Sequence, residues 1–253
     1  MTPPDGTEGI AEEAGGGTST CGADPGVAGN ERLTALAGAV LVVPIAVEIA
    51  TTPVLRAFMA AHIYVGVLIV GPLAIKLGST GWRFLRYYTG IPAFVRRGPP
   101  ASGLRLLAPL LVATTLVLFG SGLGLVITGP ARPGMFLALH AISAVIWFPM
   151  IAIHVVAYIW RVPPLVADDW RRHPAIAAAG RGLRIGVNIG ALLAAASAAI
   201  LAIPAATTWD VWVKTAGEAP GQSFFFVGTA AAILAVVAVR PTRWRSLDRD
   251  SKT

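Results

Sequence analysis

The sequence predicts an all-α protein that crosses a membrane several times. Hydrophobic residues make up 55% of the 253-residue chain, its mean hydropathy is +0.69, and only 13% of its residues are charged. Soluble domains carry about 25% charged residues. The apolar residues also gather in long stretches, as in bilayer-spanning helices. The expected fold class is therefore a polytopic membrane helix bundle.

Six stretches reach the length of about 20 predominantly apolar residues that a bilayer-spanning helix needs. They cover roughly residues 33–52, 54–76, 104–128, 134–160, 183–205 and 222–240. Glycine and proline mark boundaries between them, for example in GPARPG at 129–134. We therefore expect a domain of six transmembrane helices over residues 32–240.

The two ends of the chain differ from this domain. Residues 1–31 are rich in Gly, Pro, Thr and acids and contain no apolar run, so we expect a disordered tail rather than a secretory signal. The one cysteine, Cys21, lies in this tail and can form no disulfide within the chain. Residues 241–253 form a basic tail.

Lys and Arg are distributed unevenly among the connections. The segments 76–105 and 161–184 carry most of them, whereas the alternate connections carry Arg132 and Lys214. Because cytoplasmic loops are enriched in basic residues, the two basic segments and both termini are expected in the cytoplasm, with the bundle in the inner (plasma) membrane. Tryptophans mark the expected interfaces: Trp82, Trp160 and Trp244 inside, Trp209 and Trp212 outside.

The net charge of +7 and the pI near 10.3 could also indicate a nucleic-acid partner. The basic residues are placed as topology signals, however, and no base-reading motif accompanies them, so we expect no nucleic acid. The sequence also has no Gly-rich phosphate loop, nucleophile elbow or paired metal-binding cysteines.

Three of the four histidines lie within the apolar stretches, where ionisable side chains are costly and usually mark function. His62 is about eight residues from the outer end of the second stretch and His140 about six from that of the fourth, so the two are level. His154 follows His140 by fourteen positions, as Lys76 follows His62. Fourteen residues make almost four turns, so each pair shares a helix face, about 21 Å apart along the axis. The fourth histidine, His173, lies in a basic loop where solvation explains it.

Two neutral imidazoles that face each other across a helix bundle are the axial ligands of a low-spin b-type haem. The spacing therefore predicts an outer haem between His62 and His140 and an inner site at His154 and Lys76. A zinc or di-iron site would need more ligands, and Glu48 is the one acid near the outer level. In the alternative interpretation the histidines only form interhelical hydrogen bonds, without a cofactor.

Lys76 and several other residues have more than one expected role. As an iron ligand Lys76 would have to be deprotonated, whereas as a cation it would bind a haem propionate or extend toward the headgroups. Further candidates are Arg56, Arg132, Arg83 and Arg86 for propionates, Met59 and Met150 as reserve ligands, and Gly66, Gly71, Gly120, Gly122 and Gly124 for close approach of a macrocycle or of another helix.

The stretches that carry these residues resemble di-haem transmembrane cytochromes b of the cytochrome b561 and respiratory cytochrome b kind. They read HIYVGVLIVGPLAIKLGSTGWRFLRYYTG, RLLAPLLVATTLVLFGSGLGLVITG and LHAISAVIWFPMIAIHVVAYIW. The resemblance covers roughly residues 54–161 and extends to the bacterial membrane cytochromes that accompany molybdopterin-dependent oxidoreductases. In that family a second histidine stands where this chain has Lys76.

The resemblance implies a haem-binding four-helix core with one or two haem b groups. The expected function is electron transport in a respiratory chain, between a quinone or donor protein and a redox partner such as an oxidoreductase subunit. Two alternatives remain from the sequence: a haem-free transporter, and a membrane anchor that docks a soluble oxidoreductase through its basic loops.

Overall fold

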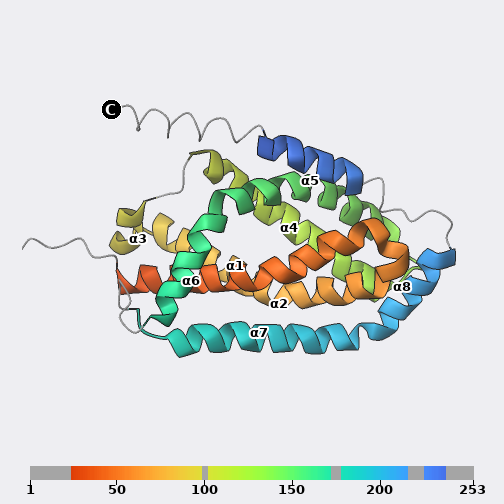
Figure 1. Cartoon of the computed structure of the whole chain (residues 1–253), viewed down its shortest axis with the longest axis horizontal. Helices are drawn as coiled ribbons and strands as arrows, with labels where there is room; N and C mark the ends of the chain where they lie inside the picture. The colour runs from red at the N-terminus through yellow and green to blue at the C-terminus, as the bar shows by residue number, and fades with distance from the viewer. Residues whose placement is uncertain (1–23, 99–101, 172–177, 216–224, 238–253) are drawn as a thin grey trace, which may run out of the picture.

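A computed structural model describes residues 24–98, 102–171, 178–215 and 225–237 (Figure 1). Every regular element in these ranges is helical, so the predicted all-α fold is confirmed. In chain order the elements are α1 (Pro25–Thr51), the 3-10 turn η1 (Thr52–Val54), α2 (Leu55–Tyr88), α3 (Pro92–Arg97), α4 (Ser102–Thr128), α5 (Gly134–Tyr158), the 3-10 turn η2 (Ile159–Arg161), α6 (Val162–Trp170), α7 (Arg181–Leu201), α8 (Ile203–Thr215) and a last helix, Phe225–Val237.

Four helical stretches of the described chain are long and apolar enough to cross a membrane. They are Pro25–Tyr88, Arg105–Thr128, Gly134–Trp170 and Arg181–Leu201. The first stretch contains α1 and α2, of 27 and 34 residues, which fold back on each other at η1. The expected span 222–240 is described only in part, as the helix Phe225–Val237. This helix is shorter than the length of about 20 residues that a membrane crossing needs. The chain is thus a membrane helix bundle.

Two expected boundaries need correction. α1 begins at Pro25, so residues 25–31, which we expected in the disordered tail, form its first turns. Asp24 starts this helix because its carboxylate accepts a hydrogen bond of 2.8 Å from the backbone N–H of Gly26. The expected span 183–205 ends at Leu201, where the chain turns into α8. Our predictions for Cys21, His173, Trp244 and the two chain ends fall on residues outside the described ranges.

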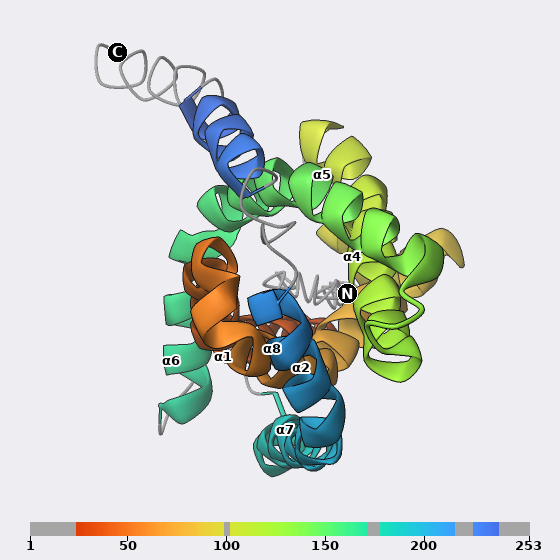
Figure 2. The same cartoon turned by 90° about the vertical axis from the view of Figure 1, so that its right-hand side faces the viewer.

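The helices are arranged as two antiparallel pairs, α1 with α2 and α4 with α5 (Figure 2). Each pair packs closely within itself, but the two pairs meet mainly where α2 contacts α4. α7 packs on α2, and α8 continues from it across one end of the bundle. α6 packs on α1 at the opposite end. The last helix contacts α5, where Phe225 and Gly228 lie against Phe148.

The contact between α2 and α7 is a close approach of two backbones. A side-chain carbon on Gly71 would lie 2.2 Å from the carbonyl oxygen of Ala191 and 2.8 Å from Cβ of Ala195. Ala195 and Ala199, one turn apart on α7, are 7% and 1% exposed. Small residues let membrane helices pack this closely, since lipid gives no hydrophobic force between them. Gly71, a candidate for a macrocycle, therefore serves helix packing instead.

Replacing Gly71 with alanine should destabilise the bundle. The added methyl group overlaps a backbone carbonyl that cannot move alone, so we expect a loss of about 1–3 kcal/mol in the free energy of unfolding. Gly78→Ala, on the same helix, is the matched control because a Cβ there meets nothing within 4 Å. Thermal unfolding in detergent measures both variants, and equal midpoints would contradict the close α2–α7 contact.

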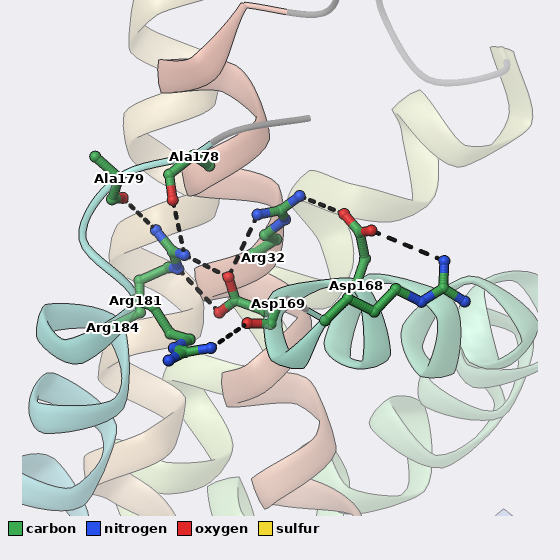
Figure 3. A network of polar contacts seen from close by, with 8 residues as sticks. Arg32, Asp168, Asp169, Ala178, Ala179, Arg181 and Arg184 are labelled. Atoms are coloured by element: carbon green, nitrogen blue, oxygen red, sulfur yellow. Dashed lines mark hydrogen bonds and ion pairs between the residues drawn. The ribbon is translucent and has the colours of Figure 1, made fainter. Parts of the chain in front are cut away.

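A cluster of buried charges holds the α6 end of the bundle together (Figure 3). Arg32 of α1 pairs with Asp168 and Asp169 of α6, and Asp169 also pairs with Arg184 of α7. Arg32, Asp169 and Arg184 are 4%, 8% and 6% exposed. Arg184 further donates to the carbonyls of residues 178–179. Because buried charges are tolerated only when they are paired, the cluster fixes three helices in one arrangement.

Removing the central carboxylate should leave an uncompensated guanidinium inside the protein. We expect Asp169→Ala to lower the free energy of unfolding by about 3–5 kcal/mol, because Arg184 then keeps only neutral acceptors among the partners described above. Asp210→Ala removes a carboxylate from the more exposed ion pair with Lys214 and should cost about 0–1 kcal/mol. Chemical unfolding in detergent distinguishes the two. A similar small loss for both would mean that the cluster does not stabilise the fold.

Candidate cofactor site

A cavity of about 560 Å³ lies between the two helix pairs, toward the end that α8 covers. Residues of α1, α2, α4 and α5 line it, together with Trp209, Trp212 and Val213 of α8. Most of the lining is apolar. The described titratable side chains in it are Glu48, His62 and His140.

His62 and His140 come together in this cavity from opposite helix pairs. The centres of their rings are 6.3 Å apart and their planes are at 82°. His62 belongs to α2, one turn after a kink where Phe58 has φ −129° and ψ 22°, and His140 belongs to the second turn of α5. The structure thus brings level the two residues that we placed at equal depth in the sequence.

Each ring turns its Nδ1 atom toward an acceptor on a neighbouring helix. Nδ1 of His140 lies 3.0 Å from the carbonyl oxygen of Leu118, and Nδ1 of His62 lies 2.6 Å from Oε2 of Glu48. The second contact is close, although its angle is not that of a regular hydrogen bond. A carbonyl oxygen only accepts, so the contact with Leu118 requires the proton on Nδ1 of His140, and the approach of Nδ1 of His62 to Glu48 fits the same tautomer. The nitrogen with a free lone pair is then Nε2, the arrangement found in metal-binding histidines.

Two glycines make room for these contacts. A side-chain carbon on Gly122 would lie 3.1 Å from Cε1 of His140, and one on Gly66 would lie 2.8 Å from Oε1 of Glu48. Of the other candidate glycines, Gly124 packs against the ring of Phe136, and Gly120 has nothing within 4 Å of its added carbon. At the cavity, Gly66 and Gly122 therefore allow close approach of the side chains of Glu48 and His140.

The inner pair of candidates is arranged differently. Nζ of Lys76 points to α1, where it lies 3.4 Å from the carbonyl oxygen of Thr34 and 2.9 Å from where Gly38 would carry a side chain. The ring of His154 stacks at 4.9 Å on Tyr158, one turn along its own helix. Neither Lys76 nor His154 lines the cavity.

The candidate arginines also lie away from the two central histidines. Arg83 is 3.6 Å from Glu31, which also forms an ion pair of 2.8 Å with Arg97. Arg86 stacks on Trp82 at 4.2 Å. Arg56 and Arg132 are exposed and do not line the cavity.

Of the two reserve methionines, one reaches the cavity. Met59 lines it, whereas Met150 packs against the cluster of Leu111, Leu118 and Trp147 between α4 and α5. Within the described part of the chain, no group of three or more His, Cys, Asp or Glu residues is placed to hold a metal ion. The site therefore offers a metal two protein nitrogens and an apolar chamber.

Two residues of this site have contacts that the sequence did not predict. Glu48, which we noted as the one acid near the outer level, contacts His62. Trp209, which we expected at the outer interface, is 4% exposed and donates from Nε1 to the carbonyl of Leu125 (3.1 Å). For Glu48 a signal existed, because α1 and α2 are joined by a three-residue turn and run antiparallel, so its depth matches that of His62. The inward face of Trp209 had no such signal, since it depends on the bend between α7 and α8.

Comparison of the chain with protein-family models, with curated proteins and with solved structures gives no match. Similarity therefore assigns no family to the chain.

Proposed function

We propose that this chain is a membrane cytochrome that binds one b-type haem between His62 and His140 and transfers single electrons. The observation that carries the proposal is the opposed pair of imidazoles in one apolar cavity, each with its Nδ1 atom turned toward an acceptor. The two Nδ1 contacts join neighbouring helices, as interhelical hydrogen bonds alone would. What favours a metal is that Nδ1 faces an acceptor in both rings, an arrangement that leaves Nε2 as the ligating nitrogen.

The dimensions of the site fit a haem. A ligating imidazole nitrogen lies about 2 Å from its metal and about 1 Å from its own ring centre, so two rings across one iron have centres roughly 6 Å apart. The observed distance of 6.3 Å between the ring centres of His62 and His140 agrees with this spacing. The cavity volume of about 560 Å³ falls within the range of roughly 300–1,000 Å³ for ligand pockets.

The chemistry that such a group supplies is a reversible one-electron change at iron. The protein residues hold it and limit what else can happen. His62 and His140 would both hold the iron, which would leave no position for oxygen or a substrate and would favour electron transfer over oxygen activation. The apolar walls exclude water, and the hydrogen bond from His140 to Leu118 keeps its ring in one orientation.

The geometry supports one haem for each chain. An inner haem would need a second ligand opposite His154, whereas Lys76 turns toward Thr34 on α1 and His154 stacks on Tyr158. Nζ of Lys76 instead lies beside the backbone of α1, and the propionate-binding and snorkelling roles weighed from the sequence stay predictions.

The charges favour one orientation in the membrane. Arginines in the last turns of α2 and α3, next to both ends of α6 and at the start of α7 favour the α3 and α6 end in the cytoplasm: Arg83, Arg97, Arg161, Arg171 and Arg181. The haem site then lies in the outer half of the plasma membrane, in a bundle of six spans with both termini inside. The electron partners that fit this location are a quinone in the lipid and a redox protein, for which the resemblance suggests a molybdopterin oxidoreductase.

The experiment that tests the proposal is a haem count per chain on purified protein. We expect one haem by pyridine haemochrome, with sharp bands in the reduced-minus-oxidised spectrum, and loss of that haem in His62→Ala and His140→Ala. His154→Ala and Lys76→Ala are the matched controls and should keep it. A colourless protein after expression with ample haem would favour the haem-free transporter, and two haems per chain would contradict the single site.

A further inference from the structure

Glu48 is a carboxylate in an apolar cavity, and its closest polar neighbour is a candidate iron ligand. It lies one turn before the end of α1, and its side chain is 16% exposed. Oε2 is fully buried, 2.6 Å from Nδ1 of His62. No Lys or Arg is among the described residues that line the cavity, so the negative charge faces His62. A buried carboxylate with a single facing group acts strongly on that group, because little solvent screens it.

A second observation links Glu48 to the opposite side of the same contact. Gly66 lies one turn after His62 on α2, and a Cβ there would approach Oε1 of Glu48 to 2.8 Å, with no other atom within 4 Å. The missing side chain therefore provides the space that the carboxylate occupies beside His62. Glu48 on α1 and Gly66 on α2 together fit the carboxylate against the imidazole.

The second imidazole has a different environment. Nδ1 of His140 faces the carbonyl of Leu118, which is a neutral acceptor, whereas Nδ1 of His62 faces a carboxylate. A carboxylate that accepts from the outer nitrogen of a ligating histidine fixes the ring and raises its basicity as a ligand, more than a carbonyl does. As ligands, the two imidazoles would therefore donate their Nε2 electron pairs to iron with unequal strength.

We propose that Glu48 is a positioning residue that holds the ring of His62 through Nδ1 and would make this imidazole the stronger of the two histidine ligands of a bound haem. The inference rests on the proposed function. A stronger donor and a nearby negative charge both stabilise the oxidised, more positive state of the iron. Glu48 therefore lowers the midpoint potential of the haem.

The test compares Glu48→Gln with wild-type protein that carries haem. The amide oxygen still accepts from His62 but has no charge, so we expect one haem per chain, a midpoint potential shifted to more positive values, and altered g values in the electron paramagnetic resonance spectrum of the oxidised protein. Asp210→Asn is the control, since it removes a charge near the same end of the bundle from a residue that does not line the cavity. It should leave potential and spectrum unchanged.

Two further variants separate orientation from charge. Glu48→Ala removes the acceptor as well, and we expect about 10- to 100-fold weaker haem binding, the usual effect of losing such a partner. Gly66→Ala keeps the carboxylate but pushes it away from His62, so the potential should shift in the same direction as in Glu48→Gln. In the double variant, measured with haem in excess, Gly66→Ala should cause no further shift in the midpoint potential beyond that of Glu48→Ala alone.

A haem-containing Glu48→Gln protein with the wild-type potential and spectrum would overturn the inference, as would an equal effect of Gly66→Ala with and without Glu48. These results leave the proposed function intact. A wild-type protein without haem would instead overturn the proposed function itself.

Discussion

The site depends on two helix pairs that pack closely within themselves and only briefly against each other. α1 with α2 and α4 with α5 each form a tight hairpin, and the cavity lies where their facing sides diverge. Such a space is unstable in a membrane protein unless something fills it, because the lining residues lose their dispersion contacts. The surrounding elements keep the pairs in position: α7 against α2 at Gly71, and the charge cluster around Asp169 at the far end.

Polar groups in the bundle follow the same constraint. Within the hydrocarbon region each donor needs a partner from the protein, since water does not supply one. Trp147 donates to Thr115, Trp209 to the carbonyl of Leu125, and the imidazole of His140 to Leu118. These bonds join α4 to α5 and α8, and they leave the cavity with few polar groups that could compete for a ligand.

The sequence allowed the all-α class, most helix positions and the level placement of His62 and His140 to be predicted, because apolar length and the 3.6-residue period are local properties. The direction in which a long side chain points is not local. Lys76 was a candidate at the inner level, but its amine lies beside Gly38 and the carbonyl oxygen of Thr34 on α1. Arg83 likewise lies beside Glu31, and the first turns of α1 form where composition indicated a tail. Each of these outcomes depends on a neighbour that is distant in sequence.

The position of α8 has a consequence for how the protein matures. The four helices that surround the cavity are complete by Tyr158, whereas the cover formed by Trp209, Trp212 and Val213 is synthesised about fifty residues later. Until then the chamber lacks its cover at this end. The proposed haem could therefore enter during synthesis, before the tryptophans close over it.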